Sequence, residues 1–303
     1  MDAFTRKEIQ KVIDAGLAED LMELGDLSSK SAVPEGCLAR GRFLAKADGV
    51  LAGLKVAEMV FASVDPKIKI SWTKSDGDYV TRGTYFGNVD GPAESVLTGE
   101  RLALNLMQRM SGIATQTNCM VEQVRPYRTK ILDTRKTAPG LRYVDKLACS
   151  IGGGTNHRMG LYDMVMIKDN HITSAGGLTN AVNKVVSYLE KRGLKGKIPI
   201  EVETRTLEEV KEALTCKDKI DRVMLDNMSK MVDEKTSRVD TTMLQQALSL
   251  IKGQIATEAS GNITLETVKQ VAASGVDYIS SGALTHSVMA LDISLKVKLI
   301  SKL

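Results

Sequence analysis

The chain has 303 residues, of which 43% are apolar, and this is enough for two domains of ordinary size with a substantial core. Its 41 basic and 37 acidic residues leave a net charge of +4, and only 4% of its residues are aromatic, so general nucleic-acid binding is disfavoured. No apolar run approaches the roughly 20 residues that a membrane span requires, so no association with a membrane is expected.

The cysteines and the N-terminus bear on the compartment. The spacing of the four cysteines supports neither a zinc site nor a disulfide framework, since they stand far apart at Cys37, Cys119, Cys149 and Cys216. The first ten residues, MDAFTRKEIQ, resemble neither a signal peptide nor an Arg-rich transit peptide. We therefore expect reduced thiols and a cytoplasmic location, with the nucleus as the alternative.

Residues 1–115 have the pattern of a small α/β domain with an antiparallel sheet. The signals are, in chain order, a helical run at 5–24 that Gly25-Asp26 ends, alternating apolar and polar runs with Asp-Gly turns at 39–53 and 67–80, and helical runs at 54–63 and 94–124. The alternating runs predict strands joined by tight turns.

From Lys130 onward, short apolar strands alternate with helical patterns. The expected strands are 130–133, 164–168, 198–203, 222–226, 254–259 and 278–281, and the expected helices are 140–149, 174–192, 206–214, 241–251 and 264–274. This rhythm predicts parallel βα units, and six of them favour a barrel or an open barrel-like sheet over 116–286. Residues 287–303 are expected to form an amphipathic helix that covers the barrel or packs on the first domain.

Positive charge is concentrated between Asp133 and His171. From Arg128 to His171 there are eight basic and four acidic residues, an excess equal to the net charge of the whole chain. The basic side chains and histidines of the stretch surround a triple glycine at 152–154, and they are Arg135, Lys136, Arg142, Lys146, His157, Arg158, Lys168 and His171. Cations around a glycine-rich turn, beside the apolar run MVMI, predict a pocket for an anionic small molecule rather than a solvated basic loop.

Polar residues follow the expected strands at their carboxyl ends. Glu203 and Asp226 supply carboxylate oxygens, which suit either Mg²⁺ or sugar hydroxyls. The segments 260–262 and 281–283 are glycine-containing turns before helical patterns, an arrangement that favours a phosphate at the last two strands of a barrel. The alternative for these two segments is a pair of ordinary turns.

Seven motifs, in order, resemble a known enzyme family: GERLALNLMQRMSGIAT, DTRKTAPGLR, GGGTNHRMGLYDMVMIKDNH, EVE, MLDN, EASGNI and SSGALTHS. From the N-terminal helix to His286 the chain resembles the quinolinate phosphoribosyltransferases of NAD biosynthesis. The resemblance implies an N-terminal α/β sandwich domain followed by an open α/β barrel, as in type II phosphoribosyltransferases. It also implies transfer of the phosphoribosyl group of 5-phosphoribosyl-1-pyrophosphate (PRPP) to quinolinate, with Mg²⁺ as cofactor, giving nicotinate mononucleotide, pyrophosphate and CO2.

The resemblance further implies roles for individual residues. Those that match the quinolinate contacts are Arg101, Arg135, His157, Arg158 and Lys168. Those that match the PRPP contacts are Lys136, Glu201, Glu203, Asp226, Ser260, Gly261, Asn262, Ser281, Gly282 and His286. The implied catalytic residues are Lys136, Lys168, Glu203 and Asp226, of which the two acids also hold Mg²⁺ directly or indirectly. Arg101, which the helix pattern alone leaves facing solvent, reaches the site of a partner subunit in a dimer or hexamer.

Two positions depart from the family pattern. Many relatives carry three alternating acids where this chain has Glu201, Glu203 and Arg205, so which glutamate has the main role stays open. Asn262 stands where relatives often have glycine, which makes the backbone there less free.

Other functions agree with part of the pattern. A nicotinate phosphoribosyltransferase would need fewer cations, and a relative of the same fold could act on a different aromatic acid. A non-catalytic sensor of a phosphorylated metabolite is disfavoured by Glu203 and Asp226, because simple anion binding does not place acids beside the phosphate. The small net charge and the few aromatic residues make a nucleic-acid-binding module the weakest alternative.

Overall fold

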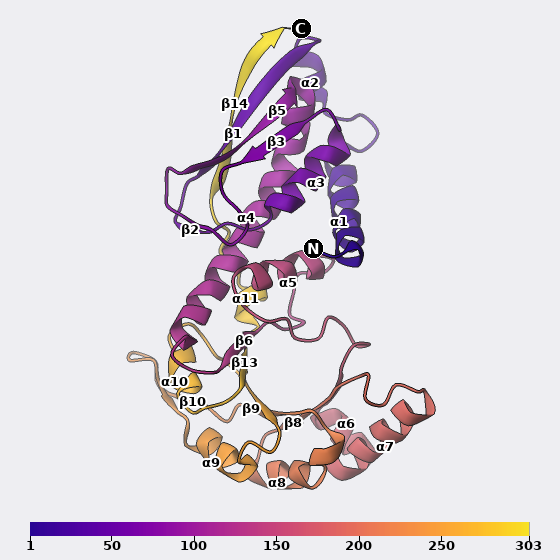
Figure 1. Cartoon of the computed structure of the whole chain (residues 1–303), viewed down its shortest axis with the longest axis vertical. Helices are drawn as coiled ribbons and strands as arrows, with labels where there is room; N and C mark the ends of the chain where they lie inside the picture. The colour runs from indigo at the N-terminus through magenta and orange to yellow at the C-terminus, as the bar shows by residue number, and fades with distance from the viewer. Residues whose placement is uncertain (303) are drawn as a thin grey trace. The chain divides into compact units, whose positions relative to one another are not determined.

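The computed structural model describes residues 1–302 and contains two compact units (Figure 1). The first unit joins Met1–Asn118 and Thr137–Gly153 with the chain from Leu284 onward, and the second joins Cys119–Lys136 with Gly154–Ala283. Residues 137–153 therefore group with the first unit, although the sequence places them in the second domain. Among the described residues, no helix combines the length and the apolar character that crossing a membrane requires.

An antiparallel sheet of four strands is the centre of the first unit, with the strand order β14-β1-β5-β3. Its strands are β1 (Cys37–Ala45), β3 (Lys69–Trp72), β5 (Tyr85–Pro92) and β14 (Ile293–Lys302). A small second sheet pairs β2 (Gly49–Val50) with β4 (Tyr79–Val80). The antiparallel sheet agrees with the expected α/β sandwich domain.

Strand β5 was not expected, because two glycines and a proline weaken its strand pattern. The structure explains one of these glycines. A Cβ atom at Gly87 would lie 2.2 Å from Cε3 of Trp72, so only glycine lets the indole ring cross this strand. The glycine that weakens the strand pattern in the sequence is therefore required by the packing of Trp72 against β5.

The expected helix over 287–303 is wrong, because most of this segment forms strand β14. Val288, Leu291 and Leu295 have helical spacing, whereas Ile293, Leu295 and Val297 alternate as in a strand, so the sequence supports both periods. Pairing with β1 decides between them, since Leu295 lies opposite Phe43 and is 7% exposed. The alternating positions Lys296 and Lys298 are exposed.

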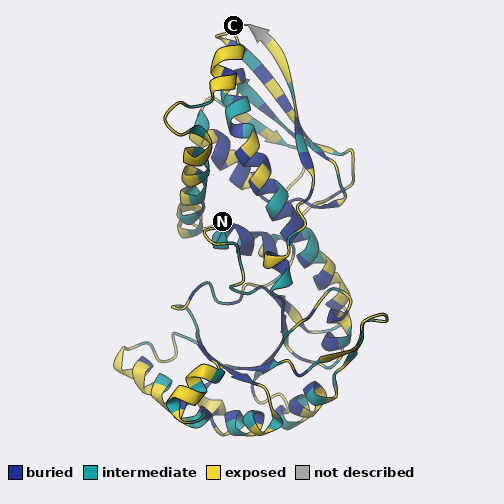
Figure 2. Ribbon diagram, turned by 180° about the vertical axis from the view of Figure 1, so that it is seen from behind, coloured by how far each residue is buried: buried dark blue, intermediate teal, exposed yellow. Residues whose placement is uncertain are grey.

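Five helices accompany this sheet: α1 (Ala3–Leu21), α2 (Leu27–Ala32), α3 (Leu54–Val64), α4 (Ala93–Val124), which crosses the boundary between the units, and α5 (Arg142–Ile151). The side chain of Asp26 caps α2 by accepting the N–H of Ser29 at 2.9 Å. The core is aromatic where α3 meets the sheet, because the ring of Phe43 packs against those of Phe61 and Phe86, and Figure 2 shows buried residues on α3 and on the sheet.

Six parallel strands form the second unit in the order β6-β13-β12-β9-β8-β7, and Figure 2 shows them curving into a ring. They are β6 (Lys130–Leu132), β7 (Val165–Ile167), β8 (Ile200–Thr204), β9 (Arg222–Asp226), β12 (Ala256–Ser260) and β13 (Tyr278–Ser280). Asp226 pairs with Ser260 and Leu225 with Thr204, so the carboxyl ends of these strands are aligned. No ladder joins β7 to β6 within residues 1–302, which confirms the expected open α/β barrel.

The helices between these strands are α6 (Asp169–Ala175), α7 (Leu178–Lys191), α8 (Leu207–Thr215), α9 (Thr242–Ile251) and α10 (Val268–Ala272), with α11 (Ala283–His286) after the last strand. The single helix expected at 174–192 is divided by Gly176 and Gly177, whose φ angles are 81° and 126°. The hairpin of β10 (Lys230–Asp233) and β11 (Arg238–Asp240) was not expected, because its strands are short and mostly polar.

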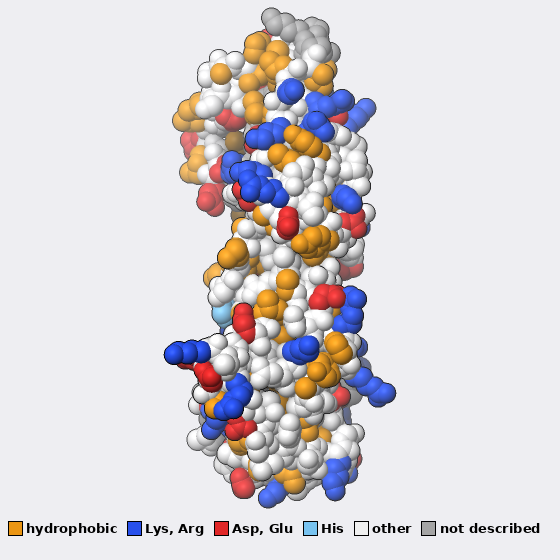
Figure 3. Space-filling model, turned by 90° about the vertical axis from the view of Figure 1, so that its left-hand side faces the viewer, with side chains coloured by type: hydrophobic (Ala, Val, Ile, Leu, Met, Phe, Trp, Pro, Cys, Tyr) orange, Lys and Arg blue, Asp and Glu red, His pale blue; other side chains and the backbone are white. Residues whose placement is uncertain are grey.

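The charged surface agrees with the small net charge. On the face that Figure 3 shows, basic and acidic side chains are interspersed rather than separated into areas of one sign. This distribution gives no support to a broad nucleic-acid-binding surface.

Candidate active site

Charged side chains of the second unit converge at the carboxyl ends of its strands. Lys168 follows β7, Glu203 lies near the end of β8, and Asp226 ends β9. Because these strands are neighbours with aligned ends, residues that are far apart in the sequence meet here. This edge of the barrel is where loops after the strands build active sites.

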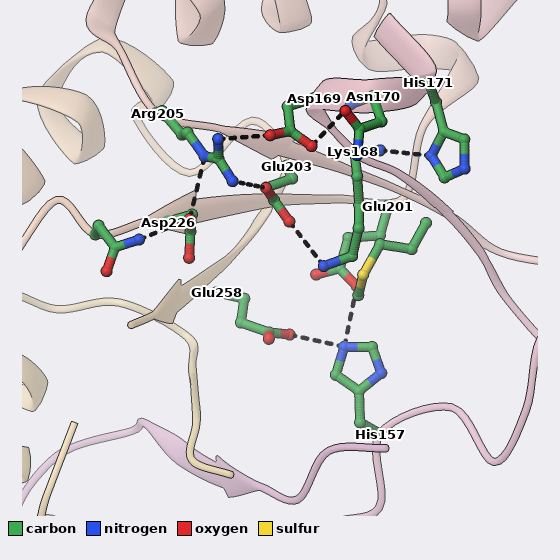
Figure 4. Close-up of polar contacts among 12 residues, drawn as sticks. His157, Lys168, Asp169, Asn170, His171, Glu201, Glu203, Arg205, Asp226 and Glu258 are labelled. Atoms are coloured by element: carbon green, nitrogen blue, oxygen red, sulfur yellow. Dashed lines mark hydrogen bonds and ion pairs between the residues drawn. The ribbon is translucent and has the colours of Figure 1, made fainter. Parts of the chain in front are cut away.

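These three residues and two more form a continuous set of ion pairs, which we call the outer network. Its members are Lys168, Asp169, Glu203, Arg205 and Asp226 (Figure 4). Glu203 lies between two cations, with Oε2 3.0 Å from Nζ of Lys168 and Oε1 2.9 Å from a terminal nitrogen of Arg205. Asp226 contacts Nε of Arg205 at 3.3 Å. The glutamate is 4% exposed in its side chain, but Lys168 and Arg205 are 46% and 49% exposed, so the cations can reach a substrate.

A second set lies deeper and is named the buried cluster: His157, Glu201, Arg222 and Glu258. Nε2 of His157 is 3.0 Å from Glu201 and 3.3 Å from Glu258, and Arg222 contacts Glu258 at 2.8 Å. Both glutamate side chains are fully buried. His157, Glu201 and Glu258 are close enough to share a metal ion, but Nε2 of His157 and the guanidinium of Arg222 already contact these acids.

The pKa of His157 depends on opposing influences. Burial disfavours the charged ring, but hydrogen bonds to Glu201 and Glu258 outweigh burial and raise the pKa of His157 to about 9. Nδ1 accepts the backbone N–H of Arg158 at 2.7 Å, so full protonation of the ring requires this contact to be released. Burial raises the pKa of Glu201, whereas for Glu258 the nearby His157 outweighs burial and lowers the pKa.

Two arginines of the basic stretch, Arg135 and Arg158, belong to the second unit and influence each other through their charges. Burial and the charge of Arg135 lower the pKa of Arg158, whose guanidinium donates to the carbonyl of Met164 at 3.2 Å. Nε of Arg135 is buried and has no hydrogen-bond partner among residues 1–302. Neighbouring guanidinium groups with an unsatisfied donor are stabilised by a bound anion, and a carboxylate fits them bidentately.

The loops after β9 and β12 interlock. The carbonyl of Ser260 accepts the N–H of Asn227 at 2.8 Å, and a Cβ atom at Gly261 would lie 2.2 Å from Oδ1 of Asn227. Gly261 and Asn262 have φ angles of 107° and 51°, and asparagine is among the few other residues that adopt this region readily. The helix expected from 264 begins as α10 at Val268, so a turn separates the loop from it.

Ser281 and Gly282 of the expected phosphate site also belong to the second unit. Ser281 is buried and its hydroxyl donates to the carbonyl of Ile263 at 2.9 Å, which ties the end of β13 to the loop, and Gly282 follows it. A pocket of about 580 Å³ opens beside Gly261 and Asn262 and extends to Lys230 of the β10–β11 hairpin. This volume is sufficient for a sugar phosphate.

Four basic residues of the sequence hypothesis belong to the first unit instead. Arg101 is exposed on α4, and Arg142 and Lys146 lie on α5, where Lys146 is 1% exposed. Nδ1 of His286, in α11, is 2.7 Å from Oγ of Ser287. The residues of the basic stretch that share the second unit are Arg135, Lys136, His157, Arg158, Lys168 and His171.

Sequence reasoning missed four charged residues of the two sets, of which Asp169 was given no role in the site. Arg205 was noted only as a departure from an acidic pattern, and Arg222 and Glu258 were given no role. A signal was present for the last of these, because an acid within the apolar strand of residues 256–260 requires a buried partner.

The contacts of the outer network do not fit a directly bound Mg²⁺. Carboxylate oxygens are the donors that Mg²⁺ prefers, but both oxygens of Glu203 contact cationic side chains. Asp226 likewise contacts Arg205 and also accepts from the amide of Asn227 at 2.8 Å. A metal ion between these two acids would have to displace Arg205.

An open parallel α/β barrel with an anion site and acids at its strand ends defines a type II phosphoribosyltransferase-like protein. Two family models match the chain, the N-terminal domain of quinolinate phosphoribosyl transferase over residues 26–111 and the C-terminal domain over 113–296. The chain belongs to the quinolinate phosphoribosyl transferase family.

Individual relatives agree with this assignment. A chloroplastic nicotinate-nucleotide pyrophosphorylase (carboxylating) of Arabidopsis thaliana is 53% identical over 294 residues, which cover 96% of this chain and 83% of that protein. A quinolinate phosphoribosyltransferase (decarboxylating) of Nicotiana tabacum is 52% identical over 96% of this chain and 82% of that protein. Among solved structures, NadC from Streptococcus pyogenes has a TM-score of 0.88 at 36% identity, with 99% of each chain covered. The nicotinate-nucleotide pyrophosphorylase from Francisella tularensis has a TM-score of 0.85 at 37% identity, with 96% of each covered.

Proposed function

We propose that the protein transfers the phosphoribosyl group of PRPP to quinolinate and decarboxylates the product, giving nicotinate mononucleotide, pyrophosphate and CO2. The reaction is a step of de novo NAD biosynthesis. The observation that carries the proposal is the buried, unsatisfied Nε of Arg135 in a barrel whose strand ends also carry Lys168, Glu203 and Asp226, with Arg158 in the same unit. The family to which the chain belongs indicates quinolinate and PRPP as the substrates, and these fit the basic side chains and the acids, respectively.

Quinolinate has two adjacent carboxylates, and the cations of the site match them. Arg135 and Arg158 bind one carboxylate through N–H donors, and His157 and Lys168 provide further positive charge. Nicotinate has a single carboxylate, so it would leave part of this charge unpaired. The cost of that unpaired charge is the basis of selectivity for the dicarboxylate.

Transfer begins when pyrophosphate leaves C1 of the ribose, which gives the sugar oxocarbenium character. Glu203 and Asp226 offset the positive charge of the sugar, and Lys136, which is exposed after β6, stabilises the leaving pyrophosphate. The pyridine nitrogen then forms the bond to C1. The 5-phosphate is held by the loop of Ser260, Gly261 and Asn262 together with Ser281 and Gly282, all of the second unit, whereas the role of His286, which belongs to the first unit, stays a prediction from the family resemblance.

Decarboxylation follows from the charge of the product ring. The bond between the ring carbon and the carboxylate next to the nitrogen breaks, CO2 leaves, and the electron pair stays on that carbon, where the positive charge of the quaternary nitrogen stabilises it until a proton binds there. No covalent bond to the protein is required.

Mg²⁺ is the proposed cofactor, and Glu203 and Asp226 act on it only indirectly, because their contacts with cationic side chains leave no direct place for it. We also keep the predictions of a cytoplasmic location and of a dimer or hexamer with Arg101 supplied across its interface. Mixing Arg101→Ala with Lys168→Ala subunits tests the last of these, because a mixed dimer would regain one intact site. Mixtures that stay inactive after subunit exchange would contradict it.

The decisive assay follows CO2 release and nucleotide formation together, with purified protein, Mg²⁺, PRPP and either quinolinate or nicotinate. Equal amounts of CO2 and nicotinate mononucleotide from quinolinate alone would establish the proposal. Product from nicotinate without CO2 would contradict it and favour a nicotinate phosphoribosyltransferase.

A further inference from the structure

Arg205 is held in one position by contacts at both of its ends. It directly follows the last residue of β8, and its backbone N–H donates to Oε2 of Glu209 at 2.6 Å. Its three guanidinium nitrogens contact three different carboxylates, those of Asp169 at 2.6 Å, Glu203 at 2.9 Å and Asp226 at 3.3 Å. An arginine that ends a strand and joins three acids from different segments is more ordered than a solvated surface side chain.

The charges around Arg205 indicate that its guanidinium occupies a place where a divalent cation would otherwise bind. The outer network contains three acids and two cations, so its net charge is −1 with Arg205 and −2 without it. Three carboxylates at adjoining strand ends, opposed only by Lys168, are an oxygen donor set of the kind that binds divalent cations. Arg205 provides the positive charge in this position, and its planar shape holds the acids in a fixed arrangement.

We propose that Arg205 is a positioning residue that excludes divalent cations from Glu203 and Asp226 and directs these carboxylates toward the ribose of the substrate. The exclusion of the metal follows from the ion pairs alone. The role toward the ribose rests on the proposed function. A metal that accompanies PRPP would add to the positive charge of Lys136 at the pyrophosphate without direct bonds to Glu203 or Asp226.

Metal binding without substrates tests the exclusion. Purified full-length protein would be titrated with Mn²⁺ in the absence of PRPP and quinolinate, and free Mn²⁺ would be followed by electron paramagnetic resonance. We expect the unchanged protein to bind Mn²⁺ weakly and Arg205→Gln to gain one site that is roughly 10- to 100-fold tighter. Arg205→Lys should stay close to the unchanged protein, and adding Asp226→Asn to Arg205→Gln should remove the new site.

A matched control separates this effect from a general change in charge. Arg40→Gln removes an exposed arginine that forms an ion pair with the single acid Asp90 at 2.6 Å in the first unit, so it should create no Mn²⁺ site. Circular dichroism and thermal unfolding would verify that each variant is folded. A folded Arg205→Gln without the new site would overturn the proposal, and so would an equally tight site in the unchanged protein that Asp226→Asn abolishes.

Kinetics test the role toward the ribose. Arg205→Gln should raise KM for PRPP more than it lowers kcat, and Arg205→Lys should restore part of the loss. A change confined to KM for quinolinate would contradict this role. If the protein does not act on quinolinate at all, the proposed function fails, but the Mn²⁺ titration still decides whether Arg205 excludes the metal.

Discussion

Glu201 and Glu203 are two residues apart on β8, yet they belong to different electrostatic environments. Glu201 is part of the buried cluster, where His157 and the acids are at most 4% exposed in their side chains. Glu203 belongs to the outer network, whose cations Lys168 and Arg205 are nearly half exposed. The fully buried acids of the cluster have no surface to offer a substrate and hold the cations beside them in place, whereas the exposed cations of the outer network can exchange a protein carboxylate for a substrate. The difference favours Glu203 for the role toward the substrate and Glu201 for a structural role.

The largest effect should come from breaking the buried cluster. Glu258→Ala leaves the buried His157 and the 16% exposed Arg222 with one acid between them, so we expect a loss of about 3–5 kcal/mol in the free energy of unfolding. Denaturant unfolding would measure it. Asp90→Ala, which removes an exposed ion pair with Arg40, should cost no more than about 1 kcal/mol. Equal losses of stability in Glu258→Ala and Asp90→Ala would contradict the claim that buried ion pairs stabilise the fold more than exposed ones.

Breaking the outer network should affect activity instead of stability. Lys168→Ala should lower kcat/KM by about 30- to 5,000-fold, equivalent to ~2–5 kcal/mol in transition-state binding. The free energy of unfolding should change by less than about 1 kcal/mol, since Lys168 is 46% exposed. Lys195→Ala is the control, because Lys195 forms an exposed ion pair with Glu190 elsewhere in the second unit. A near-normal kcat/KM for the Lys168 variant would refute its assignment.

A smaller effect should follow from changing the arginine pair. Arg135→Ala should raise KM for quinolinate by roughly 10- to 100-fold, since a hydrogen bond to a charged group contributes about 1.5–3 kcal/mol. It should also reduce the preference for quinolinate over nicotinate. Arg135→Lys keeps the charge but loses the planar fork, so it should recover only part of the affinity. An unchanged preference in both variants would place the second carboxylate elsewhere.

A separate effect, visible only as a change across a range of pH, is a dependence of stability on pH through His157. Its pKa is raised from 6.5 to about 9 in the folded state, so its stabilising contribution is complete below pH 6.5 and is lost as pH rises through 9. Urea unfolding of the unchanged protein and of His157→Gln should therefore show a difference that shrinks over this range. Parallel curves would mean that the ring stays neutral, as the contact between Nδ1 and the N–H of Arg158 favours.

Much of the barrel was predictable from the sequence, because its strands are short apolar runs between helical patterns. The strand expected at 222–226 has the same bounds in the structure. Strand β14 was mistaken for a helix because its sequence fits both periods, and only pairing with β1 excludes the helix. The hairpin of β10 and β11 was missed because polar residues dominate its short strands.

The residues of the site were predictable where a charged residue type stands directly at the end of a predicted strand. Lys168, Glu203 and Asp226 follow strands, and the structure brings all three together. Arg205 was not predictable in the same way, because its meaning depends on acids supplied by β8, β9 and the start of α6. The sequence alone presents it as a lost acid, whereas the folded chain makes it the centre of the outer network.

The pairing of β1 with β14 has a consequence for how the protein is synthesised. Ala45 of β1 lies opposite Ile293 of β14, and the whole second unit lies between them in the chain. On the ribosome, every strand of the barrel emerges before β14 does, so the barrel can fold while β1 still lacks this neighbour. The first unit, although it begins the chain, completes its sheet last, and until then β1 has an edge that other nascent chains could pair with.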